Sequence, residues 1–166
     1  MDYELYLVSK PDVDLLKDEL VALLEEAGLN VQSHKYETPN LTYFHLGCTL
    51  FDINIEIAGE DFEEDKAEDI ELCRKYYGVE INKRLGLFLY SKTFYLEGWT
   101  KLLRFTGRIL DQMEGDLLLV DDTSFPVLKR IQGQLLVNSR LDKYNIKYIT
   151  EENLKNLDYP YSFRNF

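Results

Sequence analysis

The stretch FDINIEIAG (residues 51–59) alternates strictly between apolar and polar side chains. Because successive side chains of a strand point to opposite faces of a sheet, this alternation predicts a strand with one buried and one exposed face. Half-exposed strands of this kind are typical of antiparallel sheets that have a core on one side only. The expected buried face carries Phe51, Ile53, Ile55 and Ile57, and the expected exposed face carries Asp52, Asn54 and Glu56.

The segments on either side of this strand switch between helix-like and strand-like spacing of apolar residues. Apolar residues at intervals of three and four predict helices near residues 12–27, 64–77 and 94–113. A short capped helix is expected from Thr150, and the aromatic segment 158–166 is expected to pack against the domain. Further strands are predicted at residues 3–8, 30–37, 41–48, 79–92, 116–122, 125–131, 134–139 and 143–149.

Turn residues separate several of these strands. Pro39-Asn40 is a turn signal, and Gln132-Gly133 is expected to close a hairpin. Pro126 has no backbone N–H to donate, so we expect it at a strand start or a sheet edge. The order of elements predicts an α+β fold, with a largely antiparallel sheet and about three helices packed on one face.

The chain of 166 residues is expected to form a single domain over residues 1–166. The order strand–helix–strand–strand covers residues 3–47 and recurs at residues 79–138. This recurrence allows a duplicated unit, although no residue-level identity supports one.

The net charge of −11 is unevenly distributed: residues 1–80 carry −14 and residues 81–166 carry +3. Phosphate neutralisation by Lys and Arg supplies most of the affinity for nucleic acids, so this balance disfavours direct nucleic-acid binding. The asymmetry instead indicates an acidic interaction surface. The two cysteines form no CxxC pair, no apolar run reaches 18 residues and the first residues lack a signal-peptide pattern, so we expect a cytoplasmic protein without a membrane span.

Local signatures of common enzyme classes are missing from the sequence. It contains no GxxxxGK[ST], GxGxxG, GxSxG or HExxH motif. An EF-hand loop starting at Asp61 would place Lys66 where glycine is needed and Leu72 where a bidentate glutamate belongs. We therefore expect a protein without enzymatic activity and without a cofactor.

Two sets of polar residues have both a chemical and a structural interpretation. His34, His45 and Cys48 could ligate zinc, but they lie among apolar residues of predicted strands and lack standard ligand spacing. Asp121 and Asp122 end an apolar strand, where paired carboxylates can hold Mg²⁺ or act as acid and base. Such a pair more often begins a turn. We predict no metal site at either place.

The second half of the chain carries a recognisable pattern of strands. GDLLL (residues 115–119) is followed by VLKRIQGQLLVN (residues 127–138), and the opening YELYLVSKPDVDLL (residues 3–16) completes the pattern. Over about half of its length the chain resembles immunity proteins of bacterial polymorphic toxin systems, of the contact-dependent or kin-exchanged kind. The resemblance implies a protein that neutralises a cognate toxin by binding it, and it implies no particular contact residues.

The stretch GEDFEEDKAEDIE (residues 59–71) holds eight carboxylates and one lysine. Helix N-termini favour acidic side chains, which explains one or two of them, but crowded like charges four residues apart repel by a few tenths of a kcal/mol. We therefore predict that the stretch meets a basic partner, such as a toxin. The predicted contact residues are Glu60, Asp61, Glu63, Glu64, Asp65, Glu68, Asp69 and Glu71.

Two other functions remain open at this point. The same charge would suit a phage-type anti-defence inhibitor or a nucleic-acid mimic. A small-molecule enzyme with an unrecognised site is the other possibility, and a deep pocket with convergent polar groups would favour it.

Overall fold

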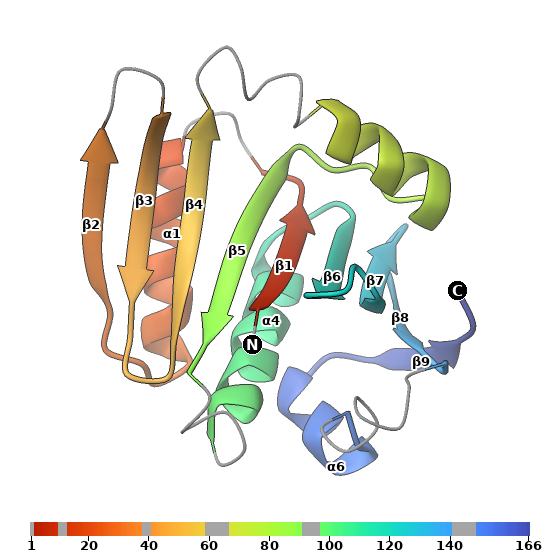
Figure 1. Ribbon diagram of the computed structural model, residues 1–166. Coiled ribbons are helices and arrows are strands. Elements are labelled where there is room, and N and C mark those ends of the chain that lie inside the picture. The colour runs from red at the N-terminus through yellow and green to blue at the C-terminus, as the bar shows by residue number, and fades with distance from the viewer. Residues whose placement is uncertain (1, 10–12, 38–40, 59–66, 91–96, 141–148) are drawn as a thin grey trace.

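The computed structural model describes residues 2–9, 13–37, 41–58, 67–90, 97–140 and 149–166 (Figure 1). The strands are β1 (Asp2–Leu7), β2 (Gln32–Glu37), β3 (Leu41–Gly47), β4 (Phe51–Ala58), β5 (Lys83–Leu89), β6 (Leu117–Asp121), β7 (Pro126–Ile131), β8 (Gln134–Asn138) and β9 (Tyr161–Arg164). The helices are α1 (Val13–Glu26), α4 (Trp99–Gln112) and α6 (Glu151–Leu154), which runs into the 3₁₀ turn η3 (Lys155–Leu157). A further helix covers residues 67–72 and continues as the π-helical turn η1 (Cys73–Tyr77); we call it the 67–77 helix.

The strands described here form one sheet in the order β2-β3-β4-β5-β1-β6-β7-β8-β9. Neighbouring strands are antiparallel except β8 and β9, which are parallel. Helices α1 and α4 lie behind the sheet in Figure 1, and the 67–77 helix lies in front of it. The predicted α+β fold with a largely antiparallel sheet is confirmed, and so are the three predicted helices. The expectation that these helices pack on one face is wrong, because the 67–77 helix covers a separate apolar cluster on the face opposite to α1 and α4.

The main core lies between the sheet and the pair α1 and α4. Apolar side chains at helical spacing point into it, as the sequence predicted: Leu16, Leu20, Leu23, Leu24 and Ala27 from α1, and Trp99, Leu102, Leu103, Phe105, Ile109 and Leu110 from α4. The strands contribute every second residue, including Phe51, Ile53 and Ile55 of β4. The exposed face predicted for β4 is therefore the face opposite to these helices.

A second, smaller core lies on the opposite face, beneath the 67–77 helix. It consists of Tyr6, Cys73, Val79, Ile81, Leu118 and Val120, with Ile70, Tyr77 and Ile131 packed against it. Ile70, Cys73 and Tyr77 thus form the inward-facing stripe of the helix. Helical spacing places Ala67 on the same stripe, but Ala67 is exposed because this core begins one turn later, at Ile70.

Turn chemistry accounts for the hairpin between β7 and β8. Gln132 and Gly133 both adopt positive φ, 51° and 77°, which matches the type I′ turn that favours glycine. Pro126 is the first residue of β7, as expected for a residue without a backbone N–H. The C-terminal segment packs as predicted, since β9 pairs with β8. The predicted turn at Pro39-Asn40 and most of the predicted strand at 143–149 lie outside the described residues.

The two strand–helix–strand–strand segments share an order of elements but not a position in the sheet. β1 is separated from β2 by β5, β4 and β3, whereas β5 is separated from β6 by β1 alone. Two strands of the second segment, β5 and β6, therefore lie on either side of β1, the first strand of the first segment.

Gly107 of α4 packs against the η3 turn. A Cβ atom at Gly107 would lie 1.9 Å from the carbonyl oxygen of Leu157. This glycine therefore allows a close approach of the helix to the C-terminal turn.

The C-terminal end of α4 is held by Arg130, a buried side chain of β7 that is 4% exposed. Its guanidinium donates to three backbone carbonyl oxygens, those of Leu110, Met113 and Gly115, each at 2.6 Å. Helix C-termini leave carbonyl groups without intrahelical partners, and here a side chain satisfies them.

Among the described residues, no helix is both long enough and apolar enough to cross a membrane.

Candidate functional site

The structure describes three of the eight acidic residues predicted to contact a partner. Glu68, Asp69 and Glu71 belong to the 67–77 helix, and the others lie outside the described residues: Glu60, Asp61, Glu63, Glu64 and Asp65. Glu68 and Glu71 are exposed, whereas Asp69 is partly buried. The three side chains therefore have different surroundings, although they belong to one charge run.

A network of charged side chains joins the 67–77 helix to the sheet. Arg84 of β5 donates to Asp69 at 3.2 Å and to the carboxylate of Glu4 on β1. Tyr6 donates to the second oxygen of Glu4 at 2.6 Å, and burial, with this hydrogen bond, raises the pKa of Tyr6 well above its ordinary value. The charge of Asp69 is thus balanced within the chain, and its role in partner binding stays a prediction.

The outer surface of the 67–77 helix combines acidic and apolar side chains. Glu68, Leu72 and Tyr76 follow at intervals of four residues, so they form one stripe along the helix. Leu72 is 40% exposed and Tyr76 is 65% exposed. Glu71 lies beside this stripe, and the Lys75 ammonium lies 5.2 Å from the centre of the Tyr76 ring. We call Glu68, Glu71, Leu72 and Tyr76 the outer stripe.

Sequence reasoning did not single out Leu72 and Tyr76. The signal was present, since both are large apolar residues that fall off the buried stripe of Ile70, Cys73 and Tyr77. Isolated surface apolar residues are common. Leu72 and Tyr76 differ from isolated residues in that they lie one turn apart on the same helix face, beside two exposed carboxylates.

The end of the 67–77 helix is fixed in place. Gly78, at φ 68°, terminates it, and its N–H donates to the carbonyl oxygen of Arg74. The Arg74 guanidinium donates twice to Glu80, both at 2.8 Å, and lowers the pKa of that carboxyl group. The Glu80 backbone N–H in turn donates to Asp116 at 2.9 Å. The outer stripe is therefore presented on an anchored helix.

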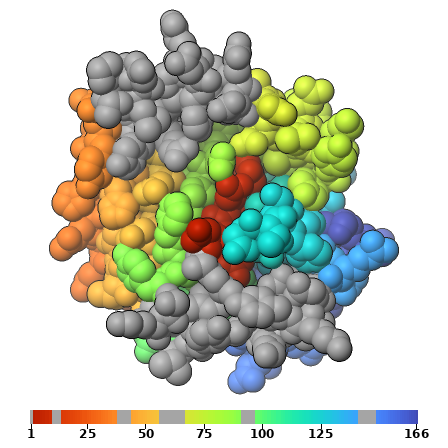
Figure 2. Space-filling model, viewed as in Figure 1, coloured from red at the N-terminus to blue at the C-terminus, as the bar shows by residue number. Residues whose placement is uncertain are grey.

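Beyond the 67–77 helix, the front of the sheet is a polar and aromatic surface, which we call the open face. It is made by side chains of β1 to β5 that point away from α1 and α4, and Figure 2 looks onto it. Strand register sets these side chains in rows across the strands. One row holds His34, His45, Asn54, Gly86 and Glu4, and the next holds Gln32, Gly47, Asp52, Phe88 and Asp2.

The two histidines considered as zinc ligands are neighbours on this face. The rings of His34 and His45 stack at 6.5 Å between centroids, and His45 Nε2 lies 3.4 Å from Asp52 Oδ2. Asp52 also accepts a hydrogen bond from the Tyr90 hydroxyl at 2.5 Å. These contacts form a polar array across β2, β3 and β4. Within the described ranges, no group of three or more His, Cys, Asp or Glu side chains is arranged to hold a metal ion.

The hydrogen bond to Asp52 raises the pKa of Tyr90 to about 12. Because the folded state holds this proton more tightly than the unfolded state, Tyr90 should stabilise the fold below pH 10 and lose this contribution between about pH 10 and 12. We predict that Asp52→Asn returns the pKa of Tyr90 toward 10, measured by NMR titration of its ring resonances. Asp111→Asn, at an exposed carboxylate on α4, should leave that pKa unchanged. Equal pKa values in the wild type and in Asp52→Asn would contradict the assignment.

Neither cysteine has the lowered thiol pKa of a reactive nucleophile. Cys48, the third zinc candidate, donates from Sγ to the carbonyl oxygen of Phe51 at 2.9 Å, and burial raises its pKa. Burial also raises the pKa of Cys73 to about 12, with a further contribution from Asp69. A thiol needs a lowered pKa to react readily near neutral pH.

Asp121 and Asp122 lie at the turn after β6. Asp121 Oδ1 accepts from the N–H and hydroxyl of Thr123, at 2.9 and 2.7 Å, and from the N–H of Phe125 at 2.9 Å. A carboxylate that binds the backbone two and four residues ahead is a common turn-stabilising arrangement. The turn interpretation of this pair is therefore the one that the hydrogen bonds support.

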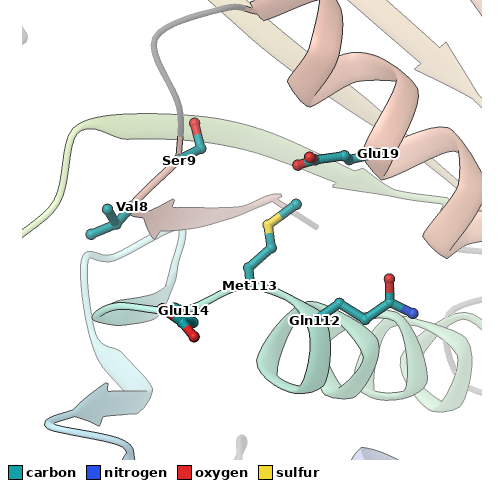
Figure 3. Close-up of a pocket in the computed structure, with 6 residues that line it drawn as sticks. All are labelled: Val8, Ser9, Glu19, Gln112, Met113 and Glu114. Atoms are coloured by element: carbon teal, nitrogen blue, oxygen red, sulfur yellow. The ribbon is translucent and has the colours of Figure 1, made fainter.

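A pocket of about 420 Å³ lies between α1, the end of β1 and the end of α4 (Figure 3). Met113 points into it from the end of α4, toward Glu19 of α1 and Ser9. Val8, Gln112 and Glu114 complete the described lining. That lining contains two carboxylates and no His, Cys, Lys or Arg side chain.

Comparison of the chain with protein-family models, with curated proteins and with solved structures finds no match.

Proposed function

We propose that this chain is a non-catalytic immunity protein that neutralises a cognate bacterial toxin by covering a basic surface of that toxin. The observation that carries the proposal is the outer stripe of the 67–77 helix. It places Leu72 and Tyr76, both exposed, beside the carboxylates of Glu68 and Glu71. The resemblance of the sequence to immunity proteins names the kind of partner.

The composition of the outer stripe suits an interface with a basic protein. Tyrosine is enriched at protein interfaces and among the few side chains that dominate binding energy. Carboxylates around such an anchor attract a cationic partner and speed its encounter, an effect that falls with ionic strength. The net charge of −14 over residues 1–80 acts in the same direction.

The anchoring of the helix supports the same function. Asp69 pairs with Arg84, and Arg74 pairs with Glu80, so the 67–77 helix is tied to the sheet and to the segment that leads from the helix into β5. A surface that is already ordered loses little conformational entropy on binding. The exposed side chains of the outer stripe therefore meet a partner from a preorganised backbone.

The first test measures electrostatic steering. The double variant Glu68→Gln, Glu71→Gln should slow association with the purified cognate toxin by about tenfold at low salt, and should flatten the salt dependence. The matched control is Glu151→Gln, Glu152→Gln, which removes the same charge from two exposed residues of α6. Association rates are measured by stopped flow across a salt series. Equal effects of the two double variants would refute the role of the outer stripe.

The second test addresses the apolar part of the outer stripe. Tyr76→Ala should weaken toxin binding by at least 2 kcal/mol, about thirtyfold, mainly through faster dissociation. Because Tyr76 is 65% exposed, its removal should change the free energy of unfolding by less than about 0.5 kcal/mol. Calorimetric titration and urea unfolding separate the two quantities. Unchanged affinity with unchanged stability would show that the toxin binds elsewhere.

A further inference from the structure

A second pocket, of about 270 Å³, opens on the front of the sheet where β1, β5 and the turn after β6 meet (Figure 2). We call it the Phe88 pocket. Its described lining combines two aromatic residues, the buried Tyr3 and the exposed Phe88, with one guanidinium and several carboxylates: Asp2, Tyr3, Glu4, Arg84, Gly86, Phe88, Asp121, Asp122 and Ser124. The larger pocket beside Met113 has acidic groups but no aromatic ring in its described lining.

The Phe88 ring leans over Gly86, which lies two residues earlier in β5 and therefore on the same face of the sheet. A Cβ atom at Gly86 would lie 3.2 Å from Cε2 of the ring, so the missing side chain leaves room for this position. Phe88 is nevertheless 39% exposed, although it belongs to a strand inside the sheet. The lining of this pocket therefore includes an aromatic ring that is accessible from solvent.

Strand register places a carboxylate on each side of this ring. Phe88 pairs with Asp52 of β4 in one direction and with Asp2 of β1 in the other. Residues paired directly across antiparallel strands have Cβ atoms about 4.5–5.5 Å apart. A flat cation on the Phe88 ring would thus lie beside Asp2, which lines the pocket, and near Asp52, which lies outside the described lining and also accepts a hydrogen bond from Tyr90. The one guanidinium in the lining, that of Arg84, is already paired with Glu4 and Asp69.

We propose that the Phe88 pocket receives an arginine side chain of the basic partner, an inference that rests on the proposed function. A guanidinium is planar, stacks on aromatic faces and donates several hydrogen bonds in its plane to carboxylates. A lysine ammonium is a strongly hydrated point charge and gains less from the ring. The pocket therefore selects arginine over lysine, and the outer stripe contacts the same partner.

The probes for this site are a hexa-arginine peptide and a hexa-lysine peptide of equal charge. The wild type should bind hexa-arginine at least threefold more tightly than hexa-lysine in calorimetry at low salt, and the backbone amide resonance of Gly86 should shift. Phe88→Leu, which keeps an apolar side chain but removes the ring, should weaken hexa-arginine about fivefold and leave hexa-lysine unchanged. Phe88→Tyr should retain the preference for arginine.

Phe163→Leu is the matched control, because Phe163 is a phenylalanine of the edge strand β9, away from β5, and is 45% exposed. It should bind both peptides as the wild type does. Equal binding of the two peptides by the wild type, or equal effects of Phe88→Leu and Phe163→Leu, would overturn the inference.

Measuring toxin binding by the variants distinguishes failure of this inference from failure of the proposed function. A toxin that binds the wild type and Phe88→Leu equally well overturns the Phe88 pocket but leaves the outer stripe in place. A toxin that responds to Phe88→Leu but not to Glu68→Gln, Glu71→Gln supports the pocket and refutes the role of the outer stripe.

Discussion

Gly107→Ala is expected to lower the free energy of unfolding by about 3 kcal/mol, because the added methyl group overpacks a rigid contact. The new Cβ would lie 1.9 Å from the carbonyl oxygen of Leu157, which is backbone and cannot rotate away. Helix α4 and the η3 turn would have to separate. On an exposed helix the same substitution stabilises by about 1 kcal/mol, so even the sign of the effect is diagnostic.

Gly86→Ala is the control for Gly107→Ala. It adds the same methyl group, but its nearest neighbour is the end of the Phe88 side chain, which can turn. We expect a loss below about 1 kcal/mol for this variant. Urea unfolding followed by circular dichroism measures both. A stability change at Gly107 no larger than that at Gly86 would show that η3 yields freely to α4.

Arg130→Met is expected to destabilise the fold by about 4 kcal/mol, the largest loss from any side chain considered. Methionine fills a similar volume but donates no hydrogen bond, so the carbonyl groups of Leu110, Met113 and Gly115 would be left without this donor. Buried carbonyls without partners cost about 1–3 kcal/mol each. The effect should appear as a lower urea midpoint with an unchanged slope.

Two further variants test whether the loss of stability comes from the lost hydrogen bonds at the end of α4. Arg130→Lys keeps the charge but cannot reach three carbonyls with one ammonium, so an intermediate stability is expected. Arg104→Met removes an exposed arginine from α4 whose hydrogen bond to Asn156 is long, at 3.4 Å, and should cost less than about 0.5 kcal/mol. Equal losses for Arg130→Met and Arg104→Met would exclude capping of α4 as the cause.

The sequence was sufficient to predict the elements of this fold but not their neighbours. Apolar spacing is a local property, so it located α1, α4 and the strand at Phe51. Strand order depends on contacts between distant segments, such as the pairing of β1 with both β5 and β6. No local pattern records that choice.

The candidate site was likewise predictable from the sequence only in part. Glu68 and Glu71 are exposed, as a charge run suggests, but Asp69 turns back to Arg84, a partner 15 residues further along the chain. The alternation of Leu85, Leu87 and Leu89 is a local pattern that indicates the buried face of β5. It could not show that the other face, at Phe88, is left open to solvent, because that depends on where the 67–77 helix packs.

The central position of β1 has a consequence for the order of folding during synthesis. β1 precedes the other described strands, yet Leu5 pairs with Leu85 on one side and Leu119 on the other. Strands β2, β3 and β4 follow one another in the chain and can pair with each other first. Until β5 and β6 are synthesised, β1 has both edges unpaired. Closing such long loops slows folding, and unpaired edges recruit other chains. A nascent chain stalled before β6 would therefore expose an aggregation-prone strand that the finished sheet encloses.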